Sequence, residues 1–235
     1  TLALSEEIIL EMSVKELFKS SSEPKKVDQV MINNAYLNIK VDSLGLANYD
    51  IAIEDTTATT GDSTATGFSL DLKHYEINNT RIKYVDESAK IALDVENLNH
   101  EGNGDFSLAT SELETYSEAL VSLDYDGVNY LNQNSVSLDA VLEMDLENMR
   151  YTFLENEAMV NQLPLTFDGY VQVNESDTEM DLSFKTPSSD FKNFLAVIPQ
   201  TYAQNIENVE TNGDFIVDGR IFGKADDTYI PKMKV

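Results

Sequence analysis

The sequence predicts a mainly β protein, because apolar and polar residues alternate along most of the chain. The longest regular run lies between Val136 and Leu146, where every second residue is apolar and only Val141 breaks the pattern. A period of two places successive side chains on opposite faces of a strand. At ~3.4 Å per residue this run would extend over roughly 35 Å, with one apolar face and one acidic face. Helical patterns are few by comparison.

Shorter runs with the same alternation recur along the chain, and each is bounded by Asn, Asp, Gly or Ser residues that favour turns. Their apolar positions are Ile8, Leu10, Met12 and Val14; Leu37, Ile39 and Val41; Tyr49, Ile51 and Ile53; Phe68, Leu70 and Leu72; Ile91, Leu93 and Val95; Val121, Leu123 and Tyr125; and Met180, Leu182 and Phe184. The clearest predicted turns are Asn78-Asn79, Gly102-Asn103-Gly104, Asp126-Gly127 and Asn212-Gly213.

Two segments predict short helices. Ser13-Val14-Lys15-Glu16 fits a capping box and predicts a helical turn through Leu17 and Phe18. Pro187-Ser188-Ser189-Asp190 is typical of a helix start and predicts a helix near residues 189–209, which Pro199 breaks or restarts. The apolar stripe of this second helix is expected to cap one end of the sheet, and it consists of Phe191, Phe194, Leu195 and Ile198.

A segment of low complexity divides the chain. Residues 55–67 contain only Asp, Thr, Ala, Ser and Gly, so no large apolar side chain offsets the entropy of ordering them. We predict a flexible linker here, between an N-terminal β segment (residues 1–54) and a main β domain (residues 68–235). A short repeat crosses the linker, because Ile32-Asn33-Asn34-Ala35 resembles Ile77-Asn78-Asn79-Thr80. Such a repeat suits a sheet extended by repeated hairpins.

The composition excludes several classes of function. The chain of 235 residues has 42 acidic and 16 basic residues and a formal net charge of −26, so it repels nucleic acids and anionic membrane surfaces. It has no cysteine, which excludes disulfides and thiolate metal sites. No apolar run is long enough to span a bilayer and no signal peptide is visible. Because the chain begins with Thr1 rather than Met, we expect it to be a piece of a longer protein.

The candidate metal sites are weak. His74 and His100 lie near predicted strand ends, where surface or turn histidines are more common than a metal pair. Oxygen ligands at His100-Glu101 and the following Gly102–Asp105 segment suit calcium, but a plain hairpin is the simpler interpretation. Asp124-Tyr125-Asp126-Gly127 lacks the rest of an EF-hand loop. We therefore predict no metal and no cofactor.

The sequence also gives little sign of catalysis. It contains no nucleophile motif, nucleotide-binding loop or zinc-binding helix. Its many carboxylates could supply a glycosidase pair, but Asp and Glu in an alternating strand usually form the solvated face. We predict a protein that is not an enzyme and has no catalytic residues.

The apolar strand faces leave two alternatives open. They form either the closed core of a structural or binding β-domain, or an open trough that holds acyl chains. A carbohydrate-binding module is a third alternative, which the absence of tryptophan disfavours. The residues expected to share the apolar face are Leu93, Val95, Val136, Leu138, Leu142, Met144, Leu146, Leu182 and Phe184.

Several segments resemble, in order, the AsmA family of Gram-negative envelope proteins. These segments are Gly-Leu-Ala-Asn-Tyr-Asp-Ile at 45–51, Ile-Asn-Asn-Thr-Arg-Ile-Lys-Tyr-Val-Asp at 77–86, Leu-Asn-His-Glu-Gly-Asn-Gly-Asp-Phe at 98–106, and the stretch 191–223. The last stretch contains Phe-Leu-Ala-Val-Ile-Pro, Asn-Gly-Asp-Phe and Gly-Arg-Ile-Phe-Gly. Each motif is short, so their order carries the resemblance. Tyr49 departs from the tryptophan more usual in the family, and the family's upstream membrane helix is missing.

The resemblance implies a long, twisted, mostly antiparallel sheet that forms a groove or partial barrel, with two short helices. It implies a periplasmic protein tethered to the inner membrane through the missing N-terminal anchor, with envelope proteins as partners. It further implies a role in outer-membrane assembly, through handling of phospholipid or another acyl-chain lipid and its transport between the inner and outer membranes. The alternative remains a closed-core β-domain without a lipid ligand.

Overall fold

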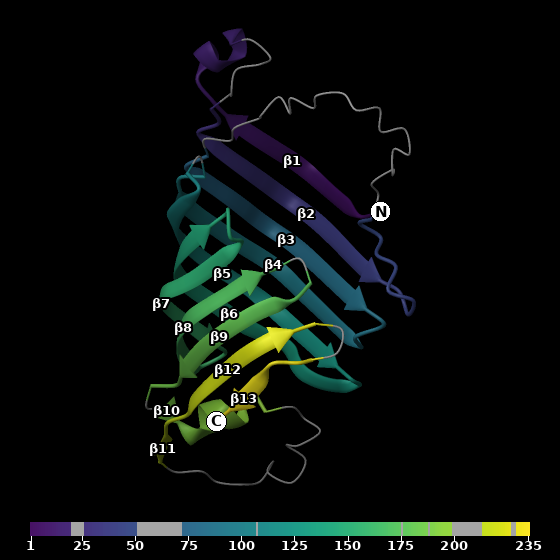
Figure 1. The fold of residues 1–235 in the computed structure, drawn as a ribbon, viewed down its shortest axis with the longest axis vertical. Helices are drawn as coiled ribbons and strands as arrows, with labels where there is room; N and C mark the ends of the chain where they lie inside the picture. Colours follow the sequence, from purple (N-terminus) through teal and green to yellow (C-terminus); the bar gives the residue numbers. More distant parts are fainter. Residues whose placement is uncertain are drawn as a thin grey trace.

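The computed structural model describes residues 1–19, 26–50, 72–106, 108–174, 176–187, 189–198, 213–226 and 229–235. The predicted β class is confirmed, because one 11-stranded sheet dominates these residues. Its strands follow one another in the order β1 to β9, then β12 and β13, and the sheet is not closed. Figure 1 shows it as a strongly twisted layer with β1 along one edge.

The strands of the large sheet are β1 (Ala3–Glu11), β2 (Gln29–Val41), β3 (His74–Asp86), β4 (Ile91–Gly104), β5 (Thr110–Tyr125), β6 (Val128–Asp145), β7 (Arg150–Val160), β8 (Leu163–Val173), β9 (Thr178–Lys185), β12 (Asp218–Ala225) and β13 (Lys232–Lys234). Strands β10 (Ser189–Asp190) and β11 (Asp214–Phe215) form a small second sheet at the lower end of the large one (Figure 1). The helical elements are the 3-10 helix η1 (Val14–Phe18) and the α-helix α1 (Phe191–Leu195).

The large sheet is mixed rather than wholly antiparallel. Strands β2 and β3 pair in parallel, whereas the other neighbouring strands pair antiparallel. A parallel pair needs a long crossover connection, and residues 42–73 provide it here. The predicted linker at 55–67 lies outside the described residues, as do Phe68 and Leu70. The division into 1–54 and 68–235 stays a prediction, although β1 and β2 belong to the same sheet as the later strands.

The internal repeat lies side by side in this parallel pair. Ile32 is opposite Ile77, and Asn33 is opposite Asn78. The Nδ2 of Asn79 donates to the Oδ1 of Asn34 at 2.7 Å, which links the repeats across the two strands. The Asn78-Asn79 turn and the repeated hairpins predicted from the repeat are therefore wrong. The repeat instead places matching asparagines on adjacent parallel strands.

Asn34 and Asn79 have positive φ angles of 51° and 47°. Asparagine tolerates this left-handed conformation better than most residues, and one such residue inside a strand makes a bulge. Ile32 and Leu37 differ by five positions, as do Ile77 and Ile82, yet all four side chains line the same cavity. Regular alternation would place residues at an odd offset on opposite faces. The bulge thus reverses the alternation and keeps apolar side chains on one face.

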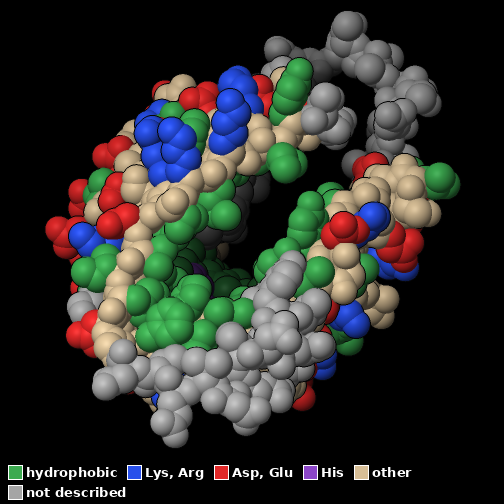
Figure 2. All heavy atoms as spheres, turned by 90° about the horizontal axis from the view of Figure 1, so that it is seen from below, with side chains coloured by type: hydrophobic (Ala, Val, Ile, Leu, Met, Phe, Trp, Pro, Cys, Tyr) green, Lys and Arg blue, Asp and Glu red, His purple; other side chains and the backbone are tan. Residues whose placement is uncertain are grey.

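Further residues with positive φ angles lie inside other strands of the sheet, namely Asn97 in β4 (54°) and Gln133 in β6 (52°). Bulges bend a strand and increase its twist, so they contribute to the curvature of the sheet. Figure 2 shows the result in the space-filling view, where hydrophobic side chains gather around a hollow and the acidic side chains lie on the outside. We call the hollow side of the sheet the inward face and the acidic side the outward face.

The long predicted strand at 136–146 overlaps β6, which begins earlier and ends one residue before the predicted end. The bulge at Gln133 explains why regular alternation begins only after it. At the other end the Asp145 carboxylate accepts hydrogen bonds from the backbone N–H groups of Glu147 (3.1 Å) and Asn148 (3.0 Å). These bonds favour a turn, so Leu146 lies in the turn rather than in the strand.

The other turn predictions have mixed outcomes. Asp126-Gly127 forms the predicted two-residue turn between β5 and β6, with φ angles of 48° and 78°. The predicted turn at Gly102-Asn103-Gly104 is wrong, because these residues form the end of β4. Tyr49 lies in a turn rather than a strand, and Asn212 lies outside the described residues.

Both helical segments contain helical residues, but not as predicted in detail. The capping box before η1 does not form, because the Ser13 side chain makes no capping hydrogen bond. Glu16 instead accepts from the backbone N–H of Lys26 at 2.8 Å. Asp190 caps α1 as expected, accepting from the backbone N–H of Lys192 at 2.9 Å. The predicted extension of this helix beyond Ile198 lies outside the described residues.

The bulge geometry predicts the stability of variants at Asn79. Asn79→Ala should lower the free energy of unfolding by about 1–2 kcal/mol, because alanine is strained at a positive φ angle. Asn79→Gly also loses the hydrogen bond to Asn34 but adopts this conformation freely, so it should cost less. Urea denaturation of both variants measures which of them is the more stable. A glycine variant less stable than the alanine variant would contradict the bulge as described.

Candidate functional site

The inward face of the sheet is the main candidate site. Strand pairing places Leu142 of β6 opposite Leu113 of β5 on one side and Phe153 of β7 on the other. Phe153 is opposite Gly169 of β8, which in turn is opposite Leu182 of β9. Because directly paired residues point to the same face, Leu142 and Leu182 share the inward face across four strands.

The same pairing connects β4 to this face. Leu93 is opposite Leu123 of β5, and Val95 is opposite Val121. Val121 and Leu113 are an even number of residues apart in a regularly paired part of β5, so they point the same way. The pairing thus brings together on the inward face Leu93, Val95, Val136, Leu138, Leu142, Met144, Leu182 and Phe184. Leu146, in the turn after β6, is 39% exposed.

These side chains are mostly half-buried. Met144, with 5% of its surface exposed, is the buried member of the set. Among the described residues of the whole chain, the buried hydrophobic side chains are Val27, Val41, Leu72, Leu113, Ala140, Met144 and Leu163. A closed sandwich would bury many more apolar residues than this. The described residues therefore form a layer whose inward face is only partly covered.

The apolar lining continues to the edge of the sheet. A cavity of about 400 Å³ lies between β1, β2 and β3, and apolar side chains from all three strands line it. Leu4 and Ile8 of β1 belong to this lining and remain 61% exposed. Ile8 is directly opposite Ile32, so it belongs to the inward face. The sequence pattern does not assign Ile8 to the apolar face, since the bulges at Asn34 and Asn79 obscure the alternation that connects it to the other strands.

The α1 stripe packs mainly on the small second sheet. The ring centres of Phe191 and Phe194 lie 5.7 Å and 5.0 Å from that of Phe215 in β11. Leu195 and Ile198 are half-buried, and Ile198 lines a small pocket with Asn134 of β6. The role of the α1 stripe in capping one end of the large sheet stays a prediction.

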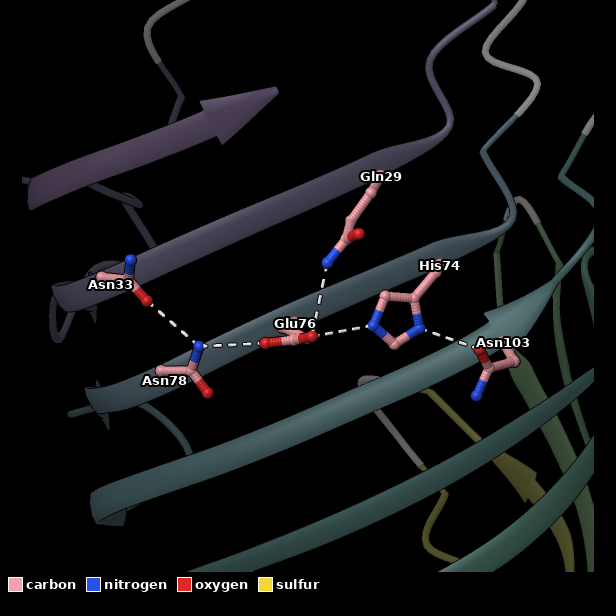
Figure 3. Close-up of polar contacts among 6 residues, drawn as sticks. All are labelled: Gln29, Asn33, His74, Glu76, Asn78 and Asn103. Carbon is pink, nitrogen blue, oxygen red and sulfur yellow. Dashed lines mark hydrogen bonds and ion pairs between the residues drawn. The ribbon is translucent and has the colours of Figure 1, made fainter. Parts of the chain in front are cut away.

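The two histidines lie on opposite faces, so they do not form a metal pair. His74, the first residue of β3, lies on the outward face, with its Nε2 2.9 Å from Glu76 and its Nδ1 2.8 Å from Asn103. Figure 3 shows this contact as part of a polar chain that continues through Asn78 to Asn33. The hydrogen bond with Glu76 raises the pKa of His74.

The prediction that His100 is a surface or turn residue is wrong. His100 lies inside β4 and points to the inward face. It contacts Tyr75 and Ser117, and burial lowers its pKa. Sequence reasoning missed this group, because a tyrosine, a histidine and a serine far apart in sequence give no signal until the strands are paired. In the part of the chain that the structure describes, no group of three acidic, histidine or cysteine side chains is arranged to hold a metal ion.

The opposite pKa shifts predict opposite effects of pH on stability. His74 binds its proton more tightly when folded, so it stabilises the protein below its ordinary pKa of 6.5, and this contribution is lost as pH rises through the raised value. His100 favours its neutral form when folded, so its contribution is lost as pH falls below 6.5. Urea denaturation of the His74→Gln and His100→Gln variants at pH 5.5 and pH 9 measures the contribution of each histidine to the free energy of unfolding.

We expect His74→Gln to reduce the free energy of unfolding more at pH 5.5 than at pH 9. His100→Gln should show the reverse order, since it removes a group whose protonation opposes folding. An equal loss at both pH values for His74→Gln would contradict the ion pair with Glu76.

Comparisons with known proteins add no identification. Over the described residues, the helices are too short to cross a bilayer. No family model, no curated protein and no solved structure matches the chain.

Proposed function

We propose that the curved sheet is a groove that holds the acyl chains of phospholipid or another acyl-chain lipid along its inward face. The protein would handle lipid in a Gram-negative cell envelope, as a periplasmic protein tethered to the inner membrane, between the inner and outer membranes. It would act by binding and not by catalysis. The resemblance to the AsmA family motivates the proposed periplasmic location and the proposed handling of lipid between the two membranes.

One observation carries the proposal: the inward face is apolar across many strands yet only half-buried. Strand pairing brings apolar side chains of β4, β6 and β9 to this face, and Ile8, which is opposite Ile32, extends it to the β1 edge. An exposed apolar surface of this extent is unfavourable in water and typical of a binding surface. Each methylene that moves from water onto it contributes ~0.8 kcal/mol, so ten methylenes supply roughly 8 kcal/mol before the costs of association.

The outward face supports the same function. In β5 the exposed side chains alternate with inward ones and include Glu112, Glu114 and Glu118. With a net charge of −26, the protein repels an anionic bilayer surface and stays in water. Lipid would therefore enter the groove at an end or through its open side, while the outward face remains hydrated.

A charged substitution on the inward face tests the groove. Leu142 is half-buried, so water can reach a carboxylate placed there. Leu142→Asp should reduce the binding of acyl-chain lipid at least tenfold while the β-sheet circular-dichroism signal is retained. The new charge would lie where acyl chains must pass, and it costs binding energy unless it stays hydrated.

Val141→Asp provides the matched control, because it adds the same charge to the adjacent, outward-facing position of the same strand. It should leave lipid binding within about twofold of the native protein. If Leu142→Asp unfolds the protein while Val141→Asp does not, the inward face is a closed core, because a buried unpaired charge is strongly destabilising. A folded Leu142→Asp variant with undiminished lipid binding would also contradict the groove.

A further inference from the structure

Three hydrogen-bonded polar side chains lie together among the apolar side chains of the inward face. The hydroxyl of Tyr75 in β3 lies 2.7 Å from the Nε2 of His100 in β4. The Nδ1 of His100 lies 2.7 Å from the Oγ of Ser117 in β5. All three side chains are half-buried, so the hollow of the groove gives access to them. We call Tyr75, His100 and Ser117 the polar triad.

A glycine holds the triad in place. Gly102 is directly opposite Tyr75, and a Cβ atom at Gly102 would lie 2.4 Å from the Tyr75 ring. Only glycine therefore allows the ring to lie across β4, with its hydroxyl at His100. Phe106 packs edge to face against the same ring, with the ring centres 5.9 Å apart. The position of the Tyr75 hydroxyl is thus fixed by packing on two sides.

The triad has one donor more than its own hydrogen bonds use. Burial lowers the pKa of His100, so at neutral pH its imidazole is uncharged and carries a single N–H. Together with the two hydroxyls this makes three polar hydrogens, whereas the two internal hydrogen bonds use two. Depending on the histidine tautomer, the remaining hydrogen belongs to Tyr75 or to Ser117. Neither side chain has another hydrogen-bond partner among the described residues.

Apolar side chains of the proposed lipid face border the triad. Ser117 is directly opposite Leu138 of β6, and His100 is directly opposite Ile77 of β3. A hydrogen-bond donor left unpaired beside apolar surface is costly, so a ligand that supplies an acceptor gains affinity there. Few, well-placed polar groups in an apolar site commonly fix the orientation of a ligand.

We propose that the polar triad is the subsite that binds an acceptor oxygen of the lipid, a carboxylate or an ester carbonyl, while the acyl chain extends from it over Leu138. This inference rests on the proposed function, and it adds that the groove binds lipids in a fixed position along their length. We assign the triad to binding and not to hydrolysis, because both ring nitrogens of His100 bond to hydroxyl groups and burial disfavours the imidazolium that a serine nucleophile requires.

The test compares three probes with the same chain length in the full chain. Palmitate carries a carboxylate, methyl palmitate carries an ester carbonyl, and hexadecane carries no acceptor. Their affinities are measured by competition with pyrene, a fluorescent hydrocarbon that also lacks an acceptor. The variant Tyr75→Phe/His100→Leu/Ser117→Ala removes every donor of the triad. Replacing all partners with apolar groups of similar size keeps the cost to folding small, and circular dichroism verifies the fold.

The matched control is Tyr151→Phe/Ser111→Ala. Both residues lie on the inward face opposite Met144, and they belong to a different row of side chains. We expect the triad variant to bind palmitate or methyl palmitate about tenfold more weakly and hexadecane unchanged, and the control to bind all three as the native protein does. The oxygen-bearing probe that loses affinity identifies the ligand as a free carboxylate or as an ester.

Three results would overturn the subsite. The triad variant could bind both oxygen-bearing probes as well as the native protein, the control could lose the same affinity, or the native protein could release palmitate from its methyl ester. If the native protein binds none of the three probes, including hexadecane, the proposed function itself fails. If the native protein and the triad variant both bind hexadecane, and the triad substitutions do not weaken the binding of either oxygen-bearing probe, the proposed groove stands and only the subsite is contradicted.

Discussion

The structure depends on one constraint: the strands of a long, open sheet must keep most of their apolar side chains on the same face. Ordinary alternation achieves this in β5 and in most of β6, where inward residues such as Leu113 and Leu142 pair directly. In β2 and β3 the alternation reverses, and the left-handed asparagines Asn34 and Asn79 restore the apolar side to the inward face. The hydrogen bond between these two asparagines keeps both bulges in register. The same bulges bend the strands, so they both direct the apolar side chains to the inward face and curve the sheet.

A single curved layer has physical consequences for stability. The described residues contain few buried hydrophobic side chains, and Val27 is the largest that is fully buried. Much of the apolar surface that stabilises other domains is therefore half-exposed on the inward face. A lipid that binds only the folded chain would stabilise it by mass action, by about 2.7 kcal/mol at a free concentration one hundred times its Kd. On this account the bound lipid supplies part of the core that the chain leaves open.

The sequence contains enough information to predict the class of fold and much of the inward face. Regular alternation from Val136 to Met144 and from Met180 to Phe184 assigns these side chains to one face, and strand pairing agrees. Alternation fails where a bulge intervenes, and for this reason Ile8, which reaches the face through its pairing with Ile32, was not assigned to it. The Asn78-Asn79 pair has the composition of a turn, because the same tolerance of positive φ serves turns and bulges alike. The parallel pairing of β2 and β3 and the meeting of Tyr75 with His100 depend on long-range contacts that no local pattern records.

The central claim is that the inward face holds acyl-chain lipid, and native mass spectrometry of the protein after gentle purification from Gram-negative cells tests it most directly. The account predicts species heavier than the chain by the mass of one or more lipids, and solvent extraction of the same sample should release molecules with acyl chains. The chain would also gain such lipids when it is stripped and then incubated with phospholipid vesicles. A chain that has only its bare mass under both conditions would contradict the account.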